Sequence, residues 1–383
     1  MNILQLLTSL NDEISIRAIA AYSKILKDNN CNSYVFAPLG RELSYFKRWG
    51  AEIASQSPTS ADITYYKAII KEICKVVSSK SIATIHVYDI AGYKAALQVS
   101  KNCRIKIIFS LLKTTSEETV IGILNKTIFG EFIPRVTTLV PSKTAYKELL
   151  TKYSRKNIDL FYVPVPVDFT VFDKKKISQE KTISLATEWG MLEKPRHIIF
   201  TKAYFHSKKW QNQIIKLSVN LEKLPENIRP YIVVLKNRAN NKQVSEFEEK
   251  YFKSRNSVLC LMDEQPSLEA ALKLSTIYLE LNPKNEFYSL DILNALAMAN
   301  TVVSWQNSIN KELVPDEFHE YLIENGDIKK LSQNLTDLLK MTSRERDFTG
   351  RTGRNYVINN FNIKNMEELL IDAYRTLSFS KAS

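Results

Sequence analysis

The sequence predicts an α/β protein of two domains, each built on a parallel sheet that helices cover on both faces. A chain of 383 residues is long enough for two ordinary domains. Its hydrophobic fraction of 44%, with 10% aromatic residues, is typical of globular rather than disordered chains. Short apolar runs rich in β-branched residues alternate with stretches of helical periodicity almost from end to end. This alternation of strand and helix is the pattern of parallel sheets.

The first half of the chain carries the predicted strands and helices of one sheet. We expect strands at 2–7, 33–37, 82–87, 104–111, 137–140 and 158–163. We expect helices at 14–28, 64–79, 91–100 and 143–153. Because a helix separates most consecutive strands, these strands should run parallel.

The second half repeats the alternation after a break. Two prolines lie in the segment 163–168, and the charged stretch 174–181 has no strong periodicity, which predicts a linker. We then expect strands at 197–201, 231–235, 257–261, 276–281 and 301–304, and helices at 211–221, 244–252, 268–274 and 290–299. Three helices close the chain, near 328–340, 344–359 and 365–376. The predicted organisation is a first domain at 1–172, a linker at 173–196 and a second domain at 197–360.

The formal net charge of +12 is unevenly spread. Residues 1–175 carry 24 Lys and Arg against 15 Asp and Glu, whereas residues 176–383 carry 29 against 26. The first half is therefore expected to face an anionic surface or substrate. Its basic amphipathic helix at 64–79 would suit an anionic membrane; an ordinary surface helix packed on the sheet is the plainer alternative. Nucleic acid is not expected as a partner, because no motif combines aromatic with basic residues.

Several kinds of site and segment are not expected. The four cysteines, Cys31, Cys74, Cys103 and Cys260, are far apart, with no histidine nearby, so neither a zinc site nor a disulfide framework follows. No P-loop or G-x-S-x-G motif occurs, which disfavours an NTPase or a hydrolase. The N-terminus lacks the basic region of a secretory signal, and no run reaches the about 18 apolar residues of a membrane span. A cytoplasmic location is the expectation.

The stretch 279–303 is the most informative part of the sequence. It predicts a buried strand ending at Pro283, a loop that carries Glu286, a helix that contains Asn294, and a second short strand. Unpaired backbone N–H groups and the helix dipole allow a helix N-terminus to hold phosphate. Open α/β sheets bind nucleotides in this way, at the carboxyl ends of their strands. We therefore expect a nucleotide site here.

The same stretch resembles the donor-sugar loop of the retaining GT-B glycosyltransferases of group 1, the E-x7-E family, whose usual form is E-G-F-G-x4-E-A-M-A followed by P-V-V. Glu286 and the spacing are kept, whereas Asn294 replaces the second Glu and both glycines are absent. Segment 163–172 resembles the family's interdomain I-P-N-G-V-D-x3-F element, and segment 359–361 its late F-x-W. The resemblance implies two Rossmann-like domains whose parallel sheets face each other across a cleft. It also implies that the C-terminal helix, within 361–383, crosses back to the N-terminal domain.

By this resemblance, the phosphates of a nucleotide sugar meet the loop after the first strand of the second domain. Lys202 stands where the family has an Arg, and Lys208 and Lys209 lie one or two residues beyond the expected Lys. Lysine keeps the positive charge of arginine but lacks its bidentate fork. Ser289 lies near the start of the helix that would share this phosphate. A solvated basic loop is the alternative for the lysines.

The resemblance assigns three more residues to the donor. Glu286 would hydrogen-bond the sugar, and Asn294 stands where the family's second Glu binds the ribose. An amide both donates and accepts hydrogen bonds, so ribose binding would be altered rather than lost; a polar position on a buried helix is the alternative. Glu312 matches the Glu of the family's G-G-x-P-E element, although its glycines read Ser308 and Ile309.

In the first domain, the segment 82–89 resembles the family's D-V-V-H-x-H-D strand end, which faces the cleft. His86 and Asp89 are therefore assigned to contacts with donor or acceptor and join Glu286 as candidate catalytic residues. A structural histidine with satisfied hydrogen bonds is the alternative for His86. The family's next strand usually ends in T-x-H-G, but the segment 109–112, which ends in Leu112, carries no histidine.

The resemblance implies a retaining glycosyltransferase that moves a sugar from a nucleotide sugar to a cell-envelope glycan or glycolipid, as in lipopolysaccharide or polysaccharide biosynthesis. It implies no metal and no cofactor, and no D-x-D motif of metal-dependent transferases occurs. The implied place of work is the inner membrane surface, approached through the basic first domain. The alternative is a GT-B scaffold that has lost catalysis and serves as a binding or assembly partner, on account of Asn294, Leu112 and the missing glycines.

Overall fold

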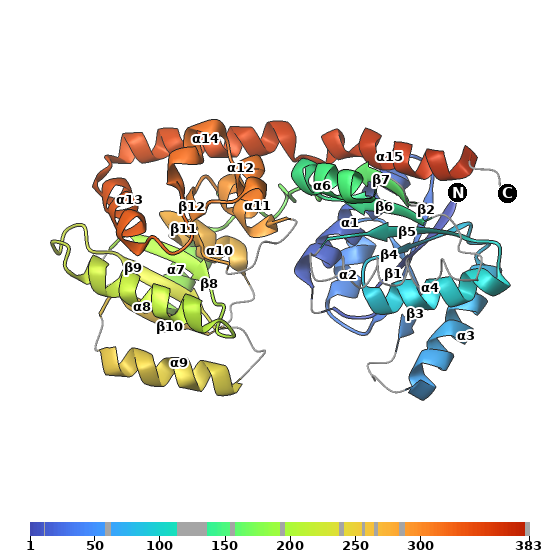
Figure 1. Cartoon of the computed structure of the whole chain (residues 1–383), viewed down its shortest axis with the longest axis horizontal. Coiled ribbons are helices and arrows are strands. Elements are labelled where there is room, and N and C mark those ends of the chain that lie inside the picture. The colour runs from blue at the N-terminus through green and yellow to red at the C-terminus, as the bar shows by residue number, and fades with distance from the viewer. Residues whose placement is uncertain are drawn as a thin grey trace. The chain divides into compact units, whose positions relative to one another are not determined.

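The computed structural model describes residues 1–10, 12–57, 63–112, 136–153, 158–191, 196–236, 241–254, 257–263, 267–282 and 288–379. The chain divides into two compact units (Figure 1). Met1–Asp168 and Phe361–Ser383 belong to the first unit, together with Tyr288. Phe169–Asn285 and Ser289–Asn360 belong to the second.

The described part of the first unit contains a seven-stranded parallel sheet in the order β3-β2-β1-β4-β5-β6-β7. Its strands are β1 (Asn2–Leu6), β2 (Asn32–Pro38), β3 (Glu52–Ser57), β4 (Thr84–Val87), β5 (Lys106–Ser110), β6 (Val136–Val140) and β7 (Ile158–Tyr162). Its helices are α1 (Glu13–Asp28), α2 (Glu42–Arg48), α3 (Ile63–Ser79), α4 (Ile90–Asn102), α6 (Lys143–Tyr153) and α15 (Ile363–Phe379). The chain builds β2 and β3 on one side of β1 and places β4 on the other. The carboxyl ends of β1 and β4 therefore flank a topological switch point, the usual ligand position in open α/β sheets.

Burial on both faces explains why apolar, β-branched segments form this sheet. Ile3 and Leu4 of β1 point to opposite faces, and both are fully buried. Helix α1 covers the sheet with Ile19, Tyr22 and Leu26, which are buried and spaced to lie on one side of the helix.

The C-terminal helix α15 is part of the first unit. It packs against α1, β6 and β7, and Figure 1 shows it in red beside β7. The backbone N–H of Val167 donates to the carbonyl of Phe361 at 2.9 Å, so the segment that leaves this unit runs beside the segment that returns to it. The expected return of the last helix to the N-terminal domain is thereby confirmed.

The described part of the second unit contains a six-stranded parallel sheet in the order β10-β9-β8-β11-β12-β13. Its strands are β8 (Ile198–Lys202), β9 (Tyr231–Leu235), β10 (Leu259–Met262), β11 (Ile277–Glu280), β12 (Thr301–Trp305) and β13 (Leu322–Ile323). Its helices are α7 (Gln179–Glu188), α8 (Lys208–Glu222), α9 (Asn241–Ser254), α10 (Leu268–Leu274), α11 (Leu290–Ala297), α12 (Ser308–Leu313), the 3-10 helix η2 (Asp316–Tyr321), α13 (Ile328–Lys340) and α14 (Ser343–Asn360). Here the switch point lies between β8 and β11.

Close packing holds α11 in place in the second unit. Helix α14 lies so near to α11 that a Cβ on Gly350 would overlap the carbonyl oxygen of Ala299, just beyond the end of α11. A Cβ on Gly353 would in turn crowd Leu296 of α11. Both glycines therefore serve close helix approach.

The predicted fold class is confirmed, since both sheets are parallel and alternate with helices. The expected ranges 231–235 and 328–340 coincide with β9 and α13. The structure adds β3, α2, β13 and α12, which the sequence patterns did not predict. It also corrects the nature of the expected linker at 173–196, because this segment contains α7, which packs against α10.

In the described ranges no helix is both long and apolar enough to cross a membrane. The same ranges contain no group of three or more His, Cys, Asp and Glu residues arranged to hold a metal ion. The cysteines Cys31, Cys74, Cys103 and Cys260 are free thiols.

Candidate functional site

A cluster of polar side chains lies at the carboxyl edge of the second sheet, where β8 and β11 pair at the switch point. We call it the carboxyl-edge cluster. Its members come from the end of β8 and the following loop, from β11, and from the start of α11: Lys202, Tyr204, Tyr278, Glu280, Ser289 and Asp291. Parallel strands end at the same edge of a sheet, so residues 76 positions apart in sequence meet here.

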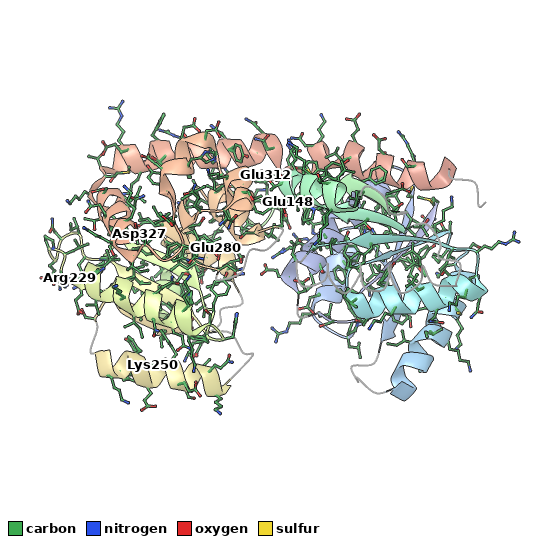
Figure 2. All side chains as sticks on the ribbon, viewed as in Figure 1. Glu148, Arg229, Lys250, Glu280, Glu312 and Asp327 are labelled. Carbon is green, nitrogen blue, oxygen red and sulfur yellow. The ribbon has the colours of Figure 1, made fainter. Side chains whose placement is uncertain are left out.

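Glu280 is the centre of this cluster. It ends β11 and is 3% exposed, and Figure 2 labels it among the elements of the second unit. Its Oε1 accepts hydrogen bonds from the Tyr204 hydroxyl at 2.6 Å and from the backbone N–H of Asn282 at 3.1 Å. Its Oε2 accepts from the hydroxyls of Tyr278 at 3.1 Å and Ser289 at 3.4 Å. One carboxylate thus joins the loop after β8, the loop after β11 and the start of α11.

Burial and then the negative charge of Asp291 raise the pKa of Glu280 above its ordinary value. The hydrogen bonds from Tyr204 and Tyr278 act in the opposite direction, as does the charge of Lys202. A buried carboxylate without partners would be strongly unfavourable. The four donors offset this penalty and hold Glu280 in one orientation.

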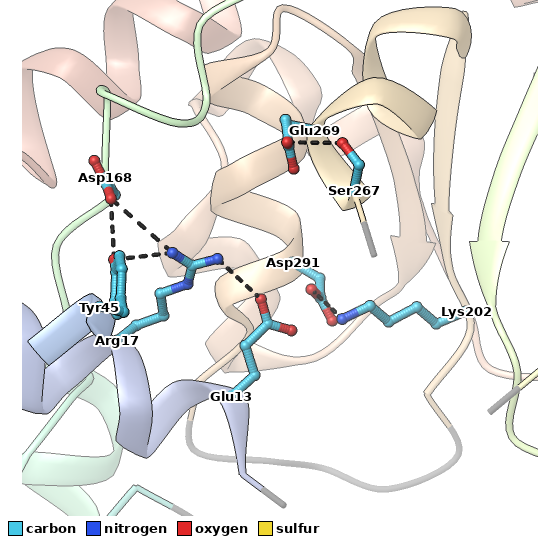
Figure 3. Close-up of polar contacts among 8 residues, drawn as sticks. All are labelled: Glu13, Arg17, Tyr45, Asp168, Lys202, Ser267, Glu269 and Asp291. Atoms are coloured by element: carbon cyan, nitrogen blue, oxygen red, sulfur yellow. Dashed lines mark hydrogen bonds and ion pairs between the residues drawn. The ribbon is translucent and has the colours of Figure 1, made fainter. Parts of the chain in front are cut away.

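Lys202 and Asp291 form an ion pair in the same cluster. The Nζ of Lys202 lies 2.6 Å from Oδ1 of Asp291, and the two side chains are 30% and 22% exposed (Figure 3). Lys202 ends β8, and Asp291 lies in the first turn of α11. Lys202 was expected to bind phosphate together with the N-terminus of α11. In the structure it is paired with Asp291, a carboxylate at that same N-terminus.

One predicted residue caps α11 and another lies within it. The hydroxyl of Ser289 accepts a hydrogen bond from the N–H of Ile292 at 3.4 Å and caps the helix. Asn294, one turn further on, is 1% exposed, and neither polar atom of its amide has a hydrogen-bond partner among the described residues. An unpaired buried amide costs roughly 1–3 kcal/mol. Such a group calls for an explanation, and a ligand contact is one.

The remaining predicted residues of the second unit differ in how they are placed. Lys208 and Lys209 are the exposed first residues of α8. Glu312 is half-buried in α12, after β12, and its carbonyl accepts a hydrogen bond from the Tyr356 hydroxyl at 2.7 Å. Glu286 lies outside the described residues.

His86 has the environment of a structural residue in the first unit. It is 0% exposed, and its Nδ1 lies 2.7 Å from the hydroxyl of Tyr374 and 3.1 Å from that of Tyr88. Its Nε2 lies 2.8 Å from the hydroxyl of Ser110. Burial lowers the pKa of His86 to about 3, which keeps the ring neutral. These contacts join β4, β5 and α15 and support the structural alternative over the expected contact with substrate.

Asp89 lies at the switch point of the first sheet. Its Oδ1 accepts from the N–H of Gly92 at 2.6 Å and caps α4. The same carboxylate accepts from the backbone N–H of Thr8 at 2.6 Å and from the Thr8 hydroxyl at 2.9 Å. Asp89 therefore connects the loop after β1 with the start of α4, and its contact with a substrate stays a prediction.

A second polar cluster lies where the chain leaves the first unit, at Asp168 (Figure 3). Nη1 of Arg17 donates to the Tyr45 hydroxyl at 2.8 Å, and this hydroxyl donates to Oδ2 of Asp168 at 3.0 Å. Nη2 of Arg17 lies 3.6 Å from the Glu13 carboxylate. Burial raises the pKa of Tyr45 to about 12, so its hydroxyl remains a donor. The cluster anchors Asp168, where the chain leaves this unit, to α1 and α2.

Sequence reasoning missed Glu280 and Asp291. The sequence does contain a signal for Glu280, which is the single charged residue inside the apolar run of β11. A charged side chain in a buried strand requires partners, so this position could have been singled out. No spacing rule connects Tyr204 with Glu280 or Lys202 with Asp291, because these contacts arise only when β8 and β11 pair.

Comparison with known proteins establishes the fold. A glycosyltransferase from Rickettsia africae ESF-5 superposes with a TM-score of 0.77 over 99% of this chain and 99% of its own, at 14% identity. Anabaena HepE, crystallised with UDP-glucose, gives a TM-score of 0.76 over 98% of this chain and 100% of its own, at 11% identity. Sucrose-phosphate synthase from Thermosynechococcus elongatus gives 0.74 over 99% of both chains, also at 11% identity. The fold is therefore GT-B. No protein-family model and no curated protein matches the sequence.

Proposed function

We propose that this chain is a glycosyltransferase that binds a nucleotide sugar at the carboxyl-edge cluster. The observation that carries the proposal is the position of the cluster, at the switch point between β8 and β11 and beside the N-terminus of α11. Open α/β sheets bind nucleotides at switch points, and helix N-termini bind phosphate. The amide of Asn294, which has no hydrogen-bond partner in the described part of the chain, adds a buried group that a ligand would satisfy. The GT-B fold and the UDP-glucose bound by HepE support a nucleotide sugar as donor.

Sugar transfer requires an enzyme to stabilise the negative charge that develops on the leaving nucleoside diphosphate. In this proposal, Lys202 and the N–H groups at the start of α11, beside Ser289, supply that stabilisation without a metal ion. Lys208 and Lys209 add positive charge at the start of α8. Asn294 exchanges hydrogen bonds with the ribose hydroxyls.

The finer features of the reaction belong to the same proposal. Glu286 orients the donor sugar, and the reaction retains the anomeric configuration. The acceptor is a cell-envelope glycan or glycolipid at the inner membrane surface. The excess of basic residues in the first half of the chain favours an anionic acceptor or surface.

Thermal-shift measurements with UDP, GDP, ADP and their sugars test the donor site, because a ligand of the native state raises its stability. One nucleotide should raise the melting temperature, and Asn294→Ala should remove most of that rise. Asn334→Ala is the matched control, since the buried amide of Asn334 in the same unit already donates to the Glu320 carbonyl at 2.8 Å. A chain that binds none of these nucleotides would count against the site.

A GT-B scaffold that does not transfer sugar is the second candidate. The pairing of Lys202 with Asp291 and the burial of His86 favour it. Product formation separates the two functions. An active transferase should lose its product in Glu286→Gln, whereas the biological role of a scaffold should survive that substitution.

A further inference from the structure

We propose that Asp291 holds Lys202 before ligand binding and releases it to the anionic group of the ligand, so that Asp291 sets the strength and selectivity of anion binding. The identification of that anion as the diphosphate of a nucleotide sugar rests on the proposed function. The exchange itself concerns only Lys202, Asp291 and a diphosphate group.

The geometry makes the Asp291 carboxylate and an incoming diphosphate compete for the Lys202 ammonium group. Asp291 lies in the first turn of α11, 2.6 Å from Lys202 Nζ, and both side chains are partly open to solvent. A carboxylate in this turn is favoured by the helix dipole and by unpaired N–H groups, which would equally favour a phosphate. An anion that reaches the start of α11 therefore meets Lys202 already engaged by Asp291.

Asn294 indicates that the ligand binds on the side of α11 that carries Asp291. It follows Asp291 by three residues, which puts both on one face of the helix. Helical side chains lean toward the N-terminus, so the Asn294 amide is directed back over the first turn. This amide is 1% exposed and unpartnered among the described residues. A ligand that satisfies it would lie next to the Lys202–Asp291 pair.

The charges of the cluster explain why an exchange is needed. Glu280 is fixed by four hydrogen bonds, including those from Tyr204 and Tyr278, and stays in place. When ionised, Glu280 and Asp291 outweigh the single charge of Lys202 among the titratable members of the cluster. These two carboxylates oppose the approach of a diphosphate, and Lys202 offsets that repulsion best when it turns from Asp291 toward the ligand. Asp291, on the partly exposed helix turn, is the carboxylate that can give way.

Isothermal titration with inorganic pyrophosphate and with UDP tests the exchange. Asp291→Asn should bind both probes roughly threefold to tenfold more tightly, the range expected when one partly screened competing charge is removed. Lys202→Met should weaken binding, and in this background Asp291→Asn should gain less than about twofold, because no ammonium remains to be released. Asp291→Ser is a second variant with the same expected direction. Circular dichroism confirms that each variant is folded.

Asp263→Asn is the matched control. Asp263 pairs with Lys236 at 2.8 Å, a Lys–Asp pair of the same unit that lies outside the cluster. This control should leave both affinities unchanged. Unchanged or weaker binding in Asp291→Asn overturns the proposal. A gain of the same size in the Lys202→Met background also overturns it, since direct repulsion rather than exchange would then explain the effect.

The outcomes separate this inference from the proposed function. Pyrophosphate binding that follows the expected pattern, with no binding of any nucleotide, supports the exchange and contradicts the donor site. UDP binding and sugar transfer with no effect of Asp291→Asn support the function and contradict the exchange. A protein that binds neither probe contradicts both.

Discussion

The buried His86 ring leads to a quantitative prediction of how the first unit responds to acid. Its pKa is lowered from 6.5 to about 3 by burial. The unfolded chain therefore binds a proton at this position between pH 6.5 and pH 3, whereas the folded chain does not. Stability is lost as the pH falls through this window, because protonation favours the unfolded state. The three ring partners, Tyr374, Tyr88 and Ser110, are neutral hydroxyls that provide no compensating negative charge.

The size of the effect follows from the same pKa. One pKa unit corresponds to about 1.4 kcal/mol, so His86 should lower the free energy of unfolding by about 2 kcal/mol at pH 5 relative to pH 7.5. The loss should reach about 4 kcal/mol at pH 3. A glutamine side chain is neutral throughout this range, so His86→Gln should lack this part of the pH dependence.

Hydrogen exchange of the β4 amides measures the prediction, because it reports opening of the first unit separately from the second. The protection lost between pH 7.5 and pH 5 should be larger in the wild type than in His86→Gln by about 2 kcal/mol, once corrected for the intrinsic exchange rate. His319→Gln, in the second unit, is the control and should behave like the wild type. Equal pH dependence in the wild type and His86→Gln would show that the ring is not held neutral by burial.

Three further predictions concern the second unit. Glu280→Ala should lower the stability of the second unit by about 2–4 kcal/mol, because it leaves several hydrogen-bond donors unpaired and creates a cavity. Urea unfolding followed by tryptophan fluorescence measures this change, and an effect below about 0.5 kcal/mol would contradict the central role of the carboxylate. Asn294→Leu should stabilise the protein by about 1 kcal/mol in a thermal melt without nucleotide, and should weaken its affinity for UDP at least about tenfold. A loss of stability would instead indicate that the amide already has hydrogen-bond partners. Gly350→Ala should cost about 2 kcal/mol or more by the same melt, because its Cβ would overlap the Ala299 carbonyl; a neutral result would mean that α14 can shift freely.

The sequence predicts those elements whose signal is local. The run Tyr-Ile-Val-Val-Leu gives β9 directly, and α13 begins where Asp327 caps its N-terminus by accepting from the N–H of Lys330 at 2.9 Å. The edge strand β3, Glu-Ile-Ala-Ser-Gln-Ser, has too few apolar residues to stand out from a loop. Helix α7 buries only Leu185 and Ala186 and so lacks a clear apolar stripe.

Part of the candidate site could likewise be predicted from the sequence, and part of it could not. The helix start near Ser289 follows from the strand–loop–helix pattern, and Lys202 was assigned by the family resemblance; both lie in the carboxyl-edge cluster. The environment of His86 could not be predicted, because its partner Tyr374 lies 288 positions away. The central role of Glu280 likewise depends on Tyr204, on a different strand's loop. Contacts of this kind are set by the order of strands in the sheet, which local periodicity does not encode.

The placement of α15 in the first unit has a consequence for protein synthesis. Among the described residues, all strands of the first sheet lie within 1–168, whereas α15, the helix that packs against β6 and β7, comes after the second unit. Tyr374, whose hydroxyl lies 2.7 Å from Nδ1 of His86, is synthesised only after the whole second unit. The packing of the first unit therefore cannot be completed until α15 has been synthesised, although the strands of its sheet are made first. A premature stop codon within α15 would consequently leave the first unit incomplete, although its strands had long been made.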